Sequence, residues 1–172
     1  MESIYVLDSS AIFLRKVHGN AVTVPEVVEE IVDEDSRFYL SIKMESHELK
    51  VENSREEFVS EVREAAKKTG DIHRLSSTDL SVLAKALELK RGGKRAVIVT
   101  DDYSIQNMAS VLDIDVEAVI QKGISRVFKW VKVCRGCGRR IESDVCPVCG
   151  GEAMLKKVIK SKEDRRGKAT KR

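Results

Sequence analysis

IYVLD at Ile4–Asp8 and AVIVTDD at Ala96–Asp102 are the two stretches of this sequence that decide its fold. Each begins as a run of four apolar, β-prone residues, which is typical of a strand buried on both faces of a parallel sheet. The carboxyl ends of such strands form a ligand crevice at one edge of the sheet. The acids that end the two runs are therefore expected to meet there, although they lie more than 90 residues apart in sequence.

Carboxylates gathered in a crevice repel one another and lose hydration, so they stabilise a protein poorly unless a cation bridges them. Carboxylate oxygens are hard ligands of the kind that Mg²⁺ and Mn²⁺ prefer. The sequence therefore predicts a divalent-metal site at the edge of an α/β sheet.

Strands and helices alternate through the first 125 residues, which predicts a Rossmann-like parallel sheet flanked by helices. The pattern places helices at 9–15, 26–32, 54–68, 79–91 and 103–112, and further short strands at 47–53 and 116–120. We expect this α/β domain at 1–122, a linker at 123–128, a ribbon that holds all the cysteines at 129–156, and a basic tail at 157–172. The tail has almost no apolar content and is expected to be disordered.

Charge is distributed unevenly along the 172-residue chain, whose formal net charge is +3. Residues 1–125 contain 16 Lys and Arg against 23 Asp and Glu, whereas residues 126–172 contain 15 against 5. A basic end on an acidic body favours a polyanionic partner such as nucleic acid, and a solvated tail without a specific partner is the alternative. No apolar run approaches the roughly 20 residues of a membrane span, and no secretory signal is apparent. We therefore expect a cytoplasmic protein without a membrane partner.

The four cysteines form two Cys-x-x-Cys pairs separated by eight residues, Cys134/Cys137 and Cys146/Cys149. A glycine directly after each pair allows a tight turn whose backbone amides can face the thiolates. This spacing predicts one structural zinc ion with four thiolate ligands and no open coordination position. Disulfides are the alternative, but nothing in the sequence indicates an oxidising compartment. Zinc would fold some twenty residues that have too little apolar surface to fold alone.

Basic residues and one tryptophan surround the cysteines, a mixture that suits phosphate contact and base stacking. Trp130 has an equally good alternative, as the small core of the ribbon or as its contact with the α/β domain. The residues predicted to contact RNA are Lys129, Trp130, Lys132, Arg135, Arg139, Arg140, Lys156 and Lys157.

Acidic side chains at four places can converge in this fold. Asp8 ends the first strand and Asp101–Asp102 ends the second, where they are hard to explain as solvated surface. Asp79 lies in the first turn of its helix, where capping and the helix dipole also explain an acid. Glu29 and Glu30 lie near the end of their helix, and Glu30 is favoured because it precedes the turn into the next loop.

Four segments resemble, in order, the acidic motifs of PIN-domain nucleases. They are VLDSSAIF at 6–13, VPEVVEEI at 24–31, LSSTDLSVLA at 75–84 and VTDDYSIQN at 99–107. Most PIN proteins lack a four-cysteine ribbon, so its presence with a basic tail narrows the match. The combination resembles the Nin-one-binding protein family in its compact archaeal form, over nearly the whole chain except the tail.

This resemblance implies a metal-dependent endoribonuclease that cleaves precursor ribosomal RNA to mature the 3′ end of small-subunit rRNA. It implies Mg²⁺ or Mn²⁺ for catalysis beside the structural zinc, the small ribosomal subunit or its RNA precursor as a partner, and a KH-domain assembly factor. Many PIN sequences place a single acid two residues after the threonine of the last motif, which favours the second of the two adjacent aspartates. The catalytic acids that the motifs imply are Asp8, Glu30, Asp79, Asp101 and Asp102.

Other functional classes stay open. The acids could be degenerate in a non-catalytic RNA-binding or ribosome-assembly module, or the chain could be a PIN-type RNase toxin, against which the ribbon argues. Phosphotransfer domains also place aspartates at strand ends. The haloacid type, however, needs a second aspartate two residues after the first, where Ser10 stands.

Overall fold

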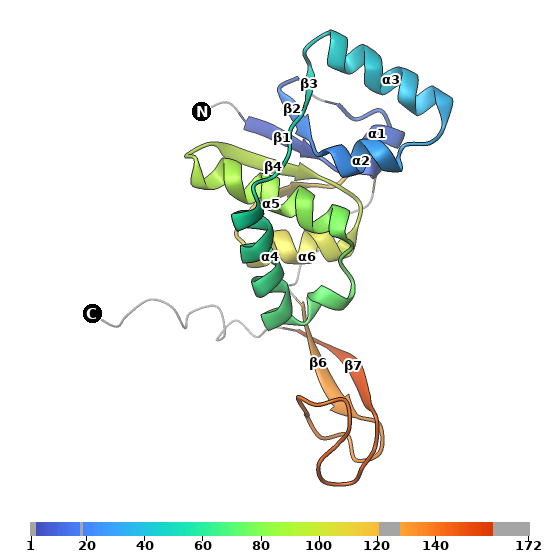
Figure 1. The fold of residues 1–172 in the computed structure, drawn as a ribbon, viewed down its shortest axis with the longest axis vertical. Coiled ribbons are helices and arrows are strands. Elements are labelled where there is room, and N and C mark those ends of the chain that lie inside the picture. The colour runs from blue at the N-terminus through green and yellow to red at the C-terminus, as the bar shows by residue number, and fades with distance from the viewer. Residues whose placement is uncertain (1–2, 18, 121–127, 160–172) are drawn as a thin grey trace, which may run out of the picture.

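The computed structural model describes residues 3–17, 19–120 and 128–159 (Figure 1). Five strands form a sheet in the order β3-β2-β1-β4-β5, and every neighbouring pair is parallel. The predicted α/β class with a parallel sheet is therefore confirmed. The strands are β1 Ser3–Leu7, β2 Ala21–Thr23, β3 Leu49–Val51, β4 Arg95–Val99 and β5 Asp115–Glu117.

Helices lie on both faces of the sheet. They are α1 Ser9–Phe13, α2 Pro25–Glu30, α3 Glu34–Glu45, α4 Glu56–Thr69, the 3₁₀ helix η1 Asp71–His73, α5 Ser77–Arg91 and α6 Tyr103–Val111. The connections from β1 to β3 run toward one edge of the sheet, and those from β3 through β4 to β5 run back toward the other. Right-handed crossovers then place α1–α3 on one face and α4–α6 on the opposite face (Figure 1).

The order of the strands reverses between β1 and β4. These two strands pair in register from Ser3 with Arg95 to Leu7 with Val99. The carboxyl ends of both strands therefore open side by side, at the position where open α/β sheets bind ligands. The acids that end the two stretches Ile4–Asp8 and Ala96–Asp102 therefore lie at one crevice.

The core lies between the central strands and the helices that cover them. Val6 and Leu7 of β1 and Ile98 and Val99 of β4 are fully buried, as expected for strands covered on both faces. Ten of the fifteen residues of α5 are buried as well, so packing holds the N-terminus of this helix firmly at the crevice. None of the helices in the described residues is long and apolar enough to cross a membrane.

The elements β2 and α3 are absent from the sequence-based prediction. β2 has only three residues, which is too short to show a pattern. α3 starts at a genuine cap, because the Asp33 carboxylate accepts a hydrogen bond from the Ser36 amide at 2.8 Å. Only Ser36 and Leu40 of its twelve residues are buried, so α3 lacks the wide apolar stripe that identifies an amphipathic helix.

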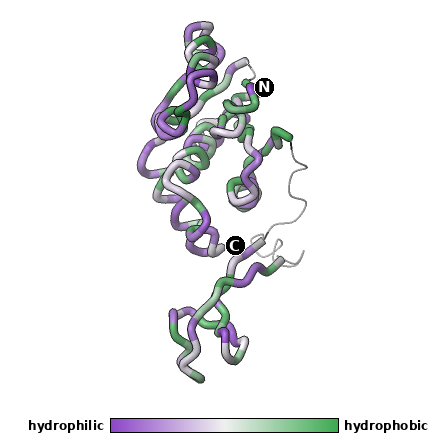
Figure 2. The backbone as a smooth tube through the Cα atoms, turned by 90° about the vertical axis from the view of Figure 1, so that its right-hand side faces the viewer, coloured by the Kyte–Doolittle hydropathy of each residue, from purple (hydrophilic) through white to green (hydrophobic). Residues whose placement is uncertain are grey.

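A separate antiparallel hairpin consists of β6 Phe128–Cys134 and β7 Ala153–Ile159. Cys134 is the last residue of β6, and the other three cysteines lie between the two strands. It extends away from the α/β domain in Figure 1. Apolar and polar segments are interspersed along it in Figure 2, and its buried cluster comprises only Cys134, Ile141 and Cys146. The predicted linker lies outside the described residues except for its last position, and so does the predicted tail beyond Ile159.

Trp130 of β6 contacts the α/β domain at the end of α4. Gly70 there has a left-handed backbone conformation with φ of +81°. A Cβ atom on residue 70 would lie 2.2 Å from the carbonyl oxygen of Trp130, so only glycine allows the two backbones to approach this closely. The structure therefore shows that Trp130 contacts the α/β domain, and its stacking on RNA stays a prediction.

We expect Gly70→Ala to lower the free energy of unfolding by about 2–3 kcal/mol, because strain at positive φ adds to a backbone clash. Gly93→Ala is the matched control: its φ is +76°, but nothing lies within 4 Å of the added Cβ, so we expect only about 1 kcal/mol. Denaturant unfolding measures both values. Trp130 is the only tryptophan, so its fluorescence spectrum is expected to change in Gly70→Ala alone. Equal effects of both variants would contradict the close contact.

Candidate functional site

Asp8 lies at the centre of the crevice, 6% exposed. Its Oδ1 accepts a hydrogen bond from the Ser9 amide at 2.7 Å, which makes it the N-cap of α1. Its Oδ2 accepts hydrogen bonds from Thr100 Oγ1 at 2.7 Å and from Ser10 Oγ at 3.3 Å. Three donors from two neighbouring strand ends therefore fix the orientation of this carboxylate.

The adjacent acids after β4 have different surroundings. Asp101 Oδ1 accepts hydrogen bonds from the amides of Val119 and Ile120 at 2.9 and 3.1 Å, and its Oδ2 accepts from Ile120 at 3.1 Å. Asp102 is exposed and is the N-cap of α6, where its Oδ1 accepts hydrogen bonds from the Ser104 and Ile105 amides. Backbone amides thus occupy both oxygens of Asp101, whereas Asp102 Oδ2 accepts no hydrogen bond from a described residue.

Asp79 enters the crevice from α5. The helix begins at Ser77, two residues earlier than predicted, because Ser76 is its N-cap. The Ser76 hydroxyl accepts a hydrogen bond from the Asp79 amide at 3.1 Å, and Asp79 Oδ2 accepts one from the Ser76 amide at 2.7 Å. This capping box fixes the side chain in the first turn. Asp8, Asp79 and Asp102 are therefore all capping residues of helices that start at this crevice.

The three carboxylates influence one another electrostatically. Burial raises the pKa of Asp8, and the charge of Asp102 raises it further. Burial likewise raises the pKa of Asp79, and Asp102 and Asp8 add to this effect. Like charges that are held together after losing water favour either protonation or a bridging cation.

The donor set of the crevice fits a hydrated divalent ion better than a fully dehydrated one. In the described part of the chain, only the four cysteines bring three or more metal-ligand atoms all within 4.8 Å of one another. The carboxylates thus interact electrostatically with one another, but they do not surround a single position closely enough to be its only ligands. Mg²⁺ commonly keeps several waters and binds through one or two carboxylates, which matches this arrangement.

The three acids of α2 differ in their surroundings. Glu29 and Glu30 are exposed, and neither has a hydrogen-bond or ion-pair partner among the described residues. Glu26, which sequence reasoning missed, accepts a hydrogen bond from Ser81 Oγ of α5 at 2.8 Å, and its Oε2 is buried without a described partner. It lies one turn before Glu30 on the same helix face, a spacing that could have identified it.

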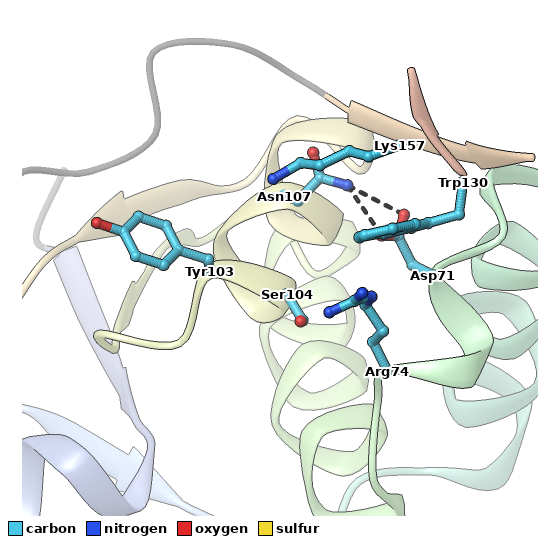
Figure 3. Close-up of a pocket in the computed structure, with 7 residues that line it drawn as sticks. All are labelled: Asp71, Arg74, Tyr103, Ser104, Asn107, Trp130 and Lys157. Atoms are coloured by element: carbon cyan, nitrogen blue, oxygen red, sulfur yellow. Dashed lines mark hydrogen bonds between the residues drawn. The ribbon is translucent and has the colours of Figure 1, made fainter. Parts of the chain in front are cut away.

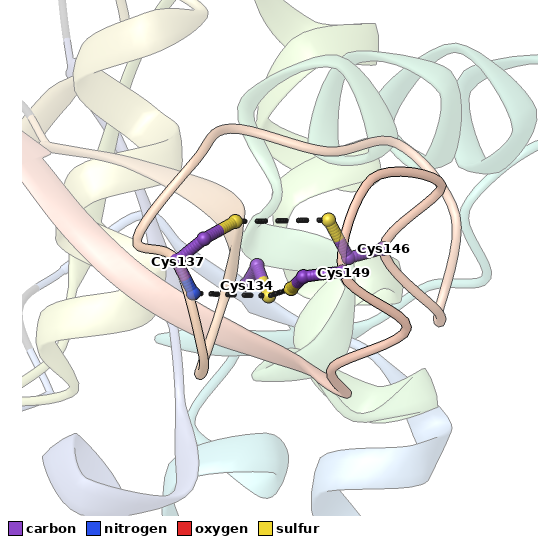
Figure 4. A group of neighbouring side chains, drawn as sticks. All are labelled: Cys134, Cys137, Cys146 and Cys149. Carbon is purple, nitrogen blue, oxygen red and sulfur yellow. Dashed lines mark hydrogen bonds between the residues drawn. The ribbon is translucent and has the colours of Figure 1, made fainter.

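The four thiols gather at the end of the hairpin (Figure 4). All are free, with Cys134 and Cys149 Sγ 3.3 Å apart and Cys137 and Cys146 Sγ 3.8 Å apart. Four thiolates around zinc at about 2.3 Å would be separated by about 3.8 Å. The backbone amide of Cys137, assisted by Cys149 and the Gly136 amide, lowers the pKa of the Cys134 thiol to about 6. Although the Gly151 amide opposes the shift, hydrogen bonding with the Cys134 and Cys137 thiols raises the pKa of the Cys149 thiol to about 11. The sulfurs thus form a metal-binding arrangement in which the Cys134 thiol ionises readily.

The residues predicted to contact RNA lie along the hairpin and its turns. Lys132 forms an ion pair with Asp144 at 2.6 Å, and this contact lies within the ribbon itself. The exposed members are Arg135, Arg139, Arg140, Lys156 and Lys157. Trp130 and Lys157 are directly paired across the two strands.

Comparisons with known proteins agree with this geometry. The family model "PIN domain of ribonuclease" matches residues 5–89. The endoribonuclease Nob1 of Archaeoglobus fulgidus is 56% identical over 165 residues, which are 95% of this chain and 97% of that protein. The protein of the same name from Pyrococcus abyssi is 40% identical over 154 residues, 87% of this chain and 91% of the relative. The chain therefore belongs to the Nob1 family of endoribonucleases, and its α/β domain is a PIN domain.

Proposed function

We propose that this protein is a metal-dependent endoribonuclease that cleaves precursor ribosomal RNA to mature the 3′ end of small-subunit rRNA. The observation that carries the proposal is the convergence of Asp8, Asp79 and Asp102 at the switch point of a PIN sheet. Relatives named endoribonuclease Nob1 match over nearly their whole length, which supports RNA as the substrate. The products are expected to carry a 5′-phosphate and a 3′-hydroxyl.

Each acid has a part in the proposed site. Thr100 and Ser10 hold Asp8 in one orientation, and the capping box does the same for Asp79. Asp102 is the better candidate ligand of the adjacent pair, since Asp101 is engaged by the amides of Val119 and Ile120. Glu30 is assigned on the motif resemblance.

The metals have separate tasks in this proposal. When bound in the crevice, Mg²⁺ or Mn²⁺ supplies an activated water and neutralises charge on the phosphoryl oxygens. The chain's own acids position the ion, and no Ser–His or Cys–His arrangement is required. Zinc at the four cysteines, which leave no position open, would hold the ribbon together.

The ribbon gives the substrate a place to bind outside the crevice. Unscreened carboxylates repel a phosphate backbone, so basic side chains on the ribbon would bring RNA to a domain that is itself acidic. A KH-domain assembly factor as a protein partner is proposed from the family resemblance.

The test is cleavage of an RNA that contains the 3′ end of the small-subunit rRNA precursor. We expect Mn²⁺-dependent cutting at one position, no cutting of a scrambled sequence, and no cutting in chelator. Mapping of the ends identifies the products. If calorimetric titration with Mn²⁺ gave no heat of binding and the RNA remained uncleaved, the results would instead favour the non-catalytic RNA-binding module.

A further inference from the structure

A pocket with no cysteine in its lining lies where the ribbon meets the PIN domain (Figure 3). It has a volume of about 70 Å³, enough for several water molecules and for the oxygens of a phosphate group. Its walls come from three places: η1 with the residue that follows it, the first half of α6, and the strands β6 and β7. The lining includes Asp71, Arg74, Tyr103, Ser104, Trp130 and Lys157.

Two cations flank the tryptophan in this pocket. The guanidinium carbon of Arg74 lies 3.7 Å from the centre of the Trp130 ring, and Lys157 Nζ lies 5.9 Å from it. Within the described residues, no carboxylate oxygen forms an ion pair with Arg74 at 4.0 Å or less. Stacking leaves the edge of the guanidinium, with its N–H donors, able to bind an anion.

The one acid of the pocket is engaged by its own neighbours. Asp71 is 1% exposed and accepts hydrogen bonds from Thr69 Oγ1 at 2.5 Å and from Asn107 Nδ2 at 3.0 Å. Burial raises its pKa, although hydrogen bonds from Thr69, Asn107 and the Trp130 side chain oppose the shift. Asp71 therefore holds the indole through a hydrogen bond, and a ligand at the mouth of the pocket meets mainly Arg74, Lys157 and the Ser104 hydroxyl.

Two of the three walls lie next to residues that contact the acidic crevice. Ser104, in one wall, donates its backbone amide to Asp102 Oδ1 at 2.6 Å. Arg74, in the other, stands two residues before Ser76, whose amide donates to Asp79 Oδ2. The pocket thus adjoins the crevice at the start of α6 and at the segment before α5.

We propose that this pocket binds a phosphate of the RNA strand next to the bond that is cleaved, with Arg74 and Lys157 supplying charge and the Ser104 hydroxyl supplying a hydrogen bond. The inference rests on the proposed function for the direction of the strand, but not for the affinity of the pocket for RNA. Trp130 has two effects here: it docks the ribbon, and it holds the Arg74 guanidinium flat in a fixed place. A phosphate captured at this point leads the backbone from the basic ribbon into the crevice.

RNA binding by Arg74→Gln/Lys157→Gln tests the pocket, with each protein carrying Asp8→Asn to prevent cleavage. In a filter-binding salt titration we expect about 10-fold weaker binding and a log–log salt slope shallower by about 0.7–1.4, as for the loss of one or two backbone contacts. Lys94→Gln/Arg95→Gln is the charge-matched control, because these exposed residues lie at the opposite end of β4. Lys157→Gln alone, at an exposed position, still tests the pocket if the double variant misfolds. Unfolding curves check that every protein is folded.

Single uncharged methylphosphonate linkages in the RNA locate the contact. We expect one linkage beside the cleaved bond to weaken binding by the parent protein and to have no further effect in Arg74→Gln/Lys157→Gln. Binding losses equal to the control's, or equal sensitivity to every linkage in both proteins, would overturn the proposal. If the wild-type protein cuts no RNA while the coupling persists, the proposed function fails and the pocket stands.

Discussion

Asp8→Asn is expected to reduce RNA cleavage by at least about 100-fold, while RNA affinity stays within about twofold of the wild-type value. The carboxylate lies at the centre of the crevice, and its amide analogue loses the charge that holds a cation. The caps survive, because the Asn side-chain oxygen can still accept the Ser9 amide. Single-turnover cleavage with saturating Mn²⁺ measures the first effect, and filter binding measures the second.

Three other Asp→Asn variants serve as comparisons for this experiment. Asp35→Asn, an exposed acid in the first turn of α3, controls for a change of one charge and is expected to cleave normally. Asp102→Asn is expected to resemble Asp8→Asn, whereas Asp101→Asn should lower thermal stability more than cleavage, since it disturbs the contacts to Val119 and Ile120. Full cleavage by Asp8→Asn in a metal-replete assay would refute the proposed mechanism.

Cys146→Ser is expected to abolish zinc binding and to weaken RNA binding by about 10-fold or more, without unfolding the PIN domain. The buried cluster of the ribbon consists of little beyond two of the cysteines and Ile141, so metal binding and ribbon folding are the same event. The core of the PIN domain includes none of these residues. Metal analysis, circular dichroism and a salt titration of RNA binding report the three outcomes.

The control for this substitution is Val148→Ser in the same turn. Val148 is 59% exposed, and its replacement leaves all four thiolates in place, so we expect one zinc ion per chain and wild-type affinity. If Cys146→Ser lost zinc but bound RNA with an unchanged salt dependence, the ribbon would have a different role, such as docking to a protein.

Much of the fold follows from short-range patterns, because continuous apolar strands and helix caps are local signals. The acids of β1 and β4 could be placed together for this reason. β2 and α3 could not be predicted, since one is very short and the other buries only two side chains. The same limit applies to the start of α5, where three consecutive hydroxyl residues, Ser76 to Thr78, all make plausible caps.

The site was predictable in its residue types and less so in its contacts. Motif position gave Asp8 and Asp79 as candidates, but only the structure shows that backbone amides occupy Asp101. The environment of Glu26 depends on how α2 meets α5, which is a tertiary contact with no local signature. The pairing of Arg74 with Trp130, 56 residues further along the chain, likewise depends on the docking of the ribbon.

That Asp8, Asp79 and Asp102 each cap a helix affects how this enzyme can evolve and be stored. Even without metal in the crevice, every one of these acids has backbone or hydroxyl donors as partners, so loss of Mg²⁺ or Mn²⁺ leaves the PIN domain folded. Asparagine and serine satisfy a helix N-terminus nearly as well as aspartate. A single substitution can therefore turn the nuclease into a stable RNA-binding protein, and the catalytic lineage and its inactive descendants would share one scaffold.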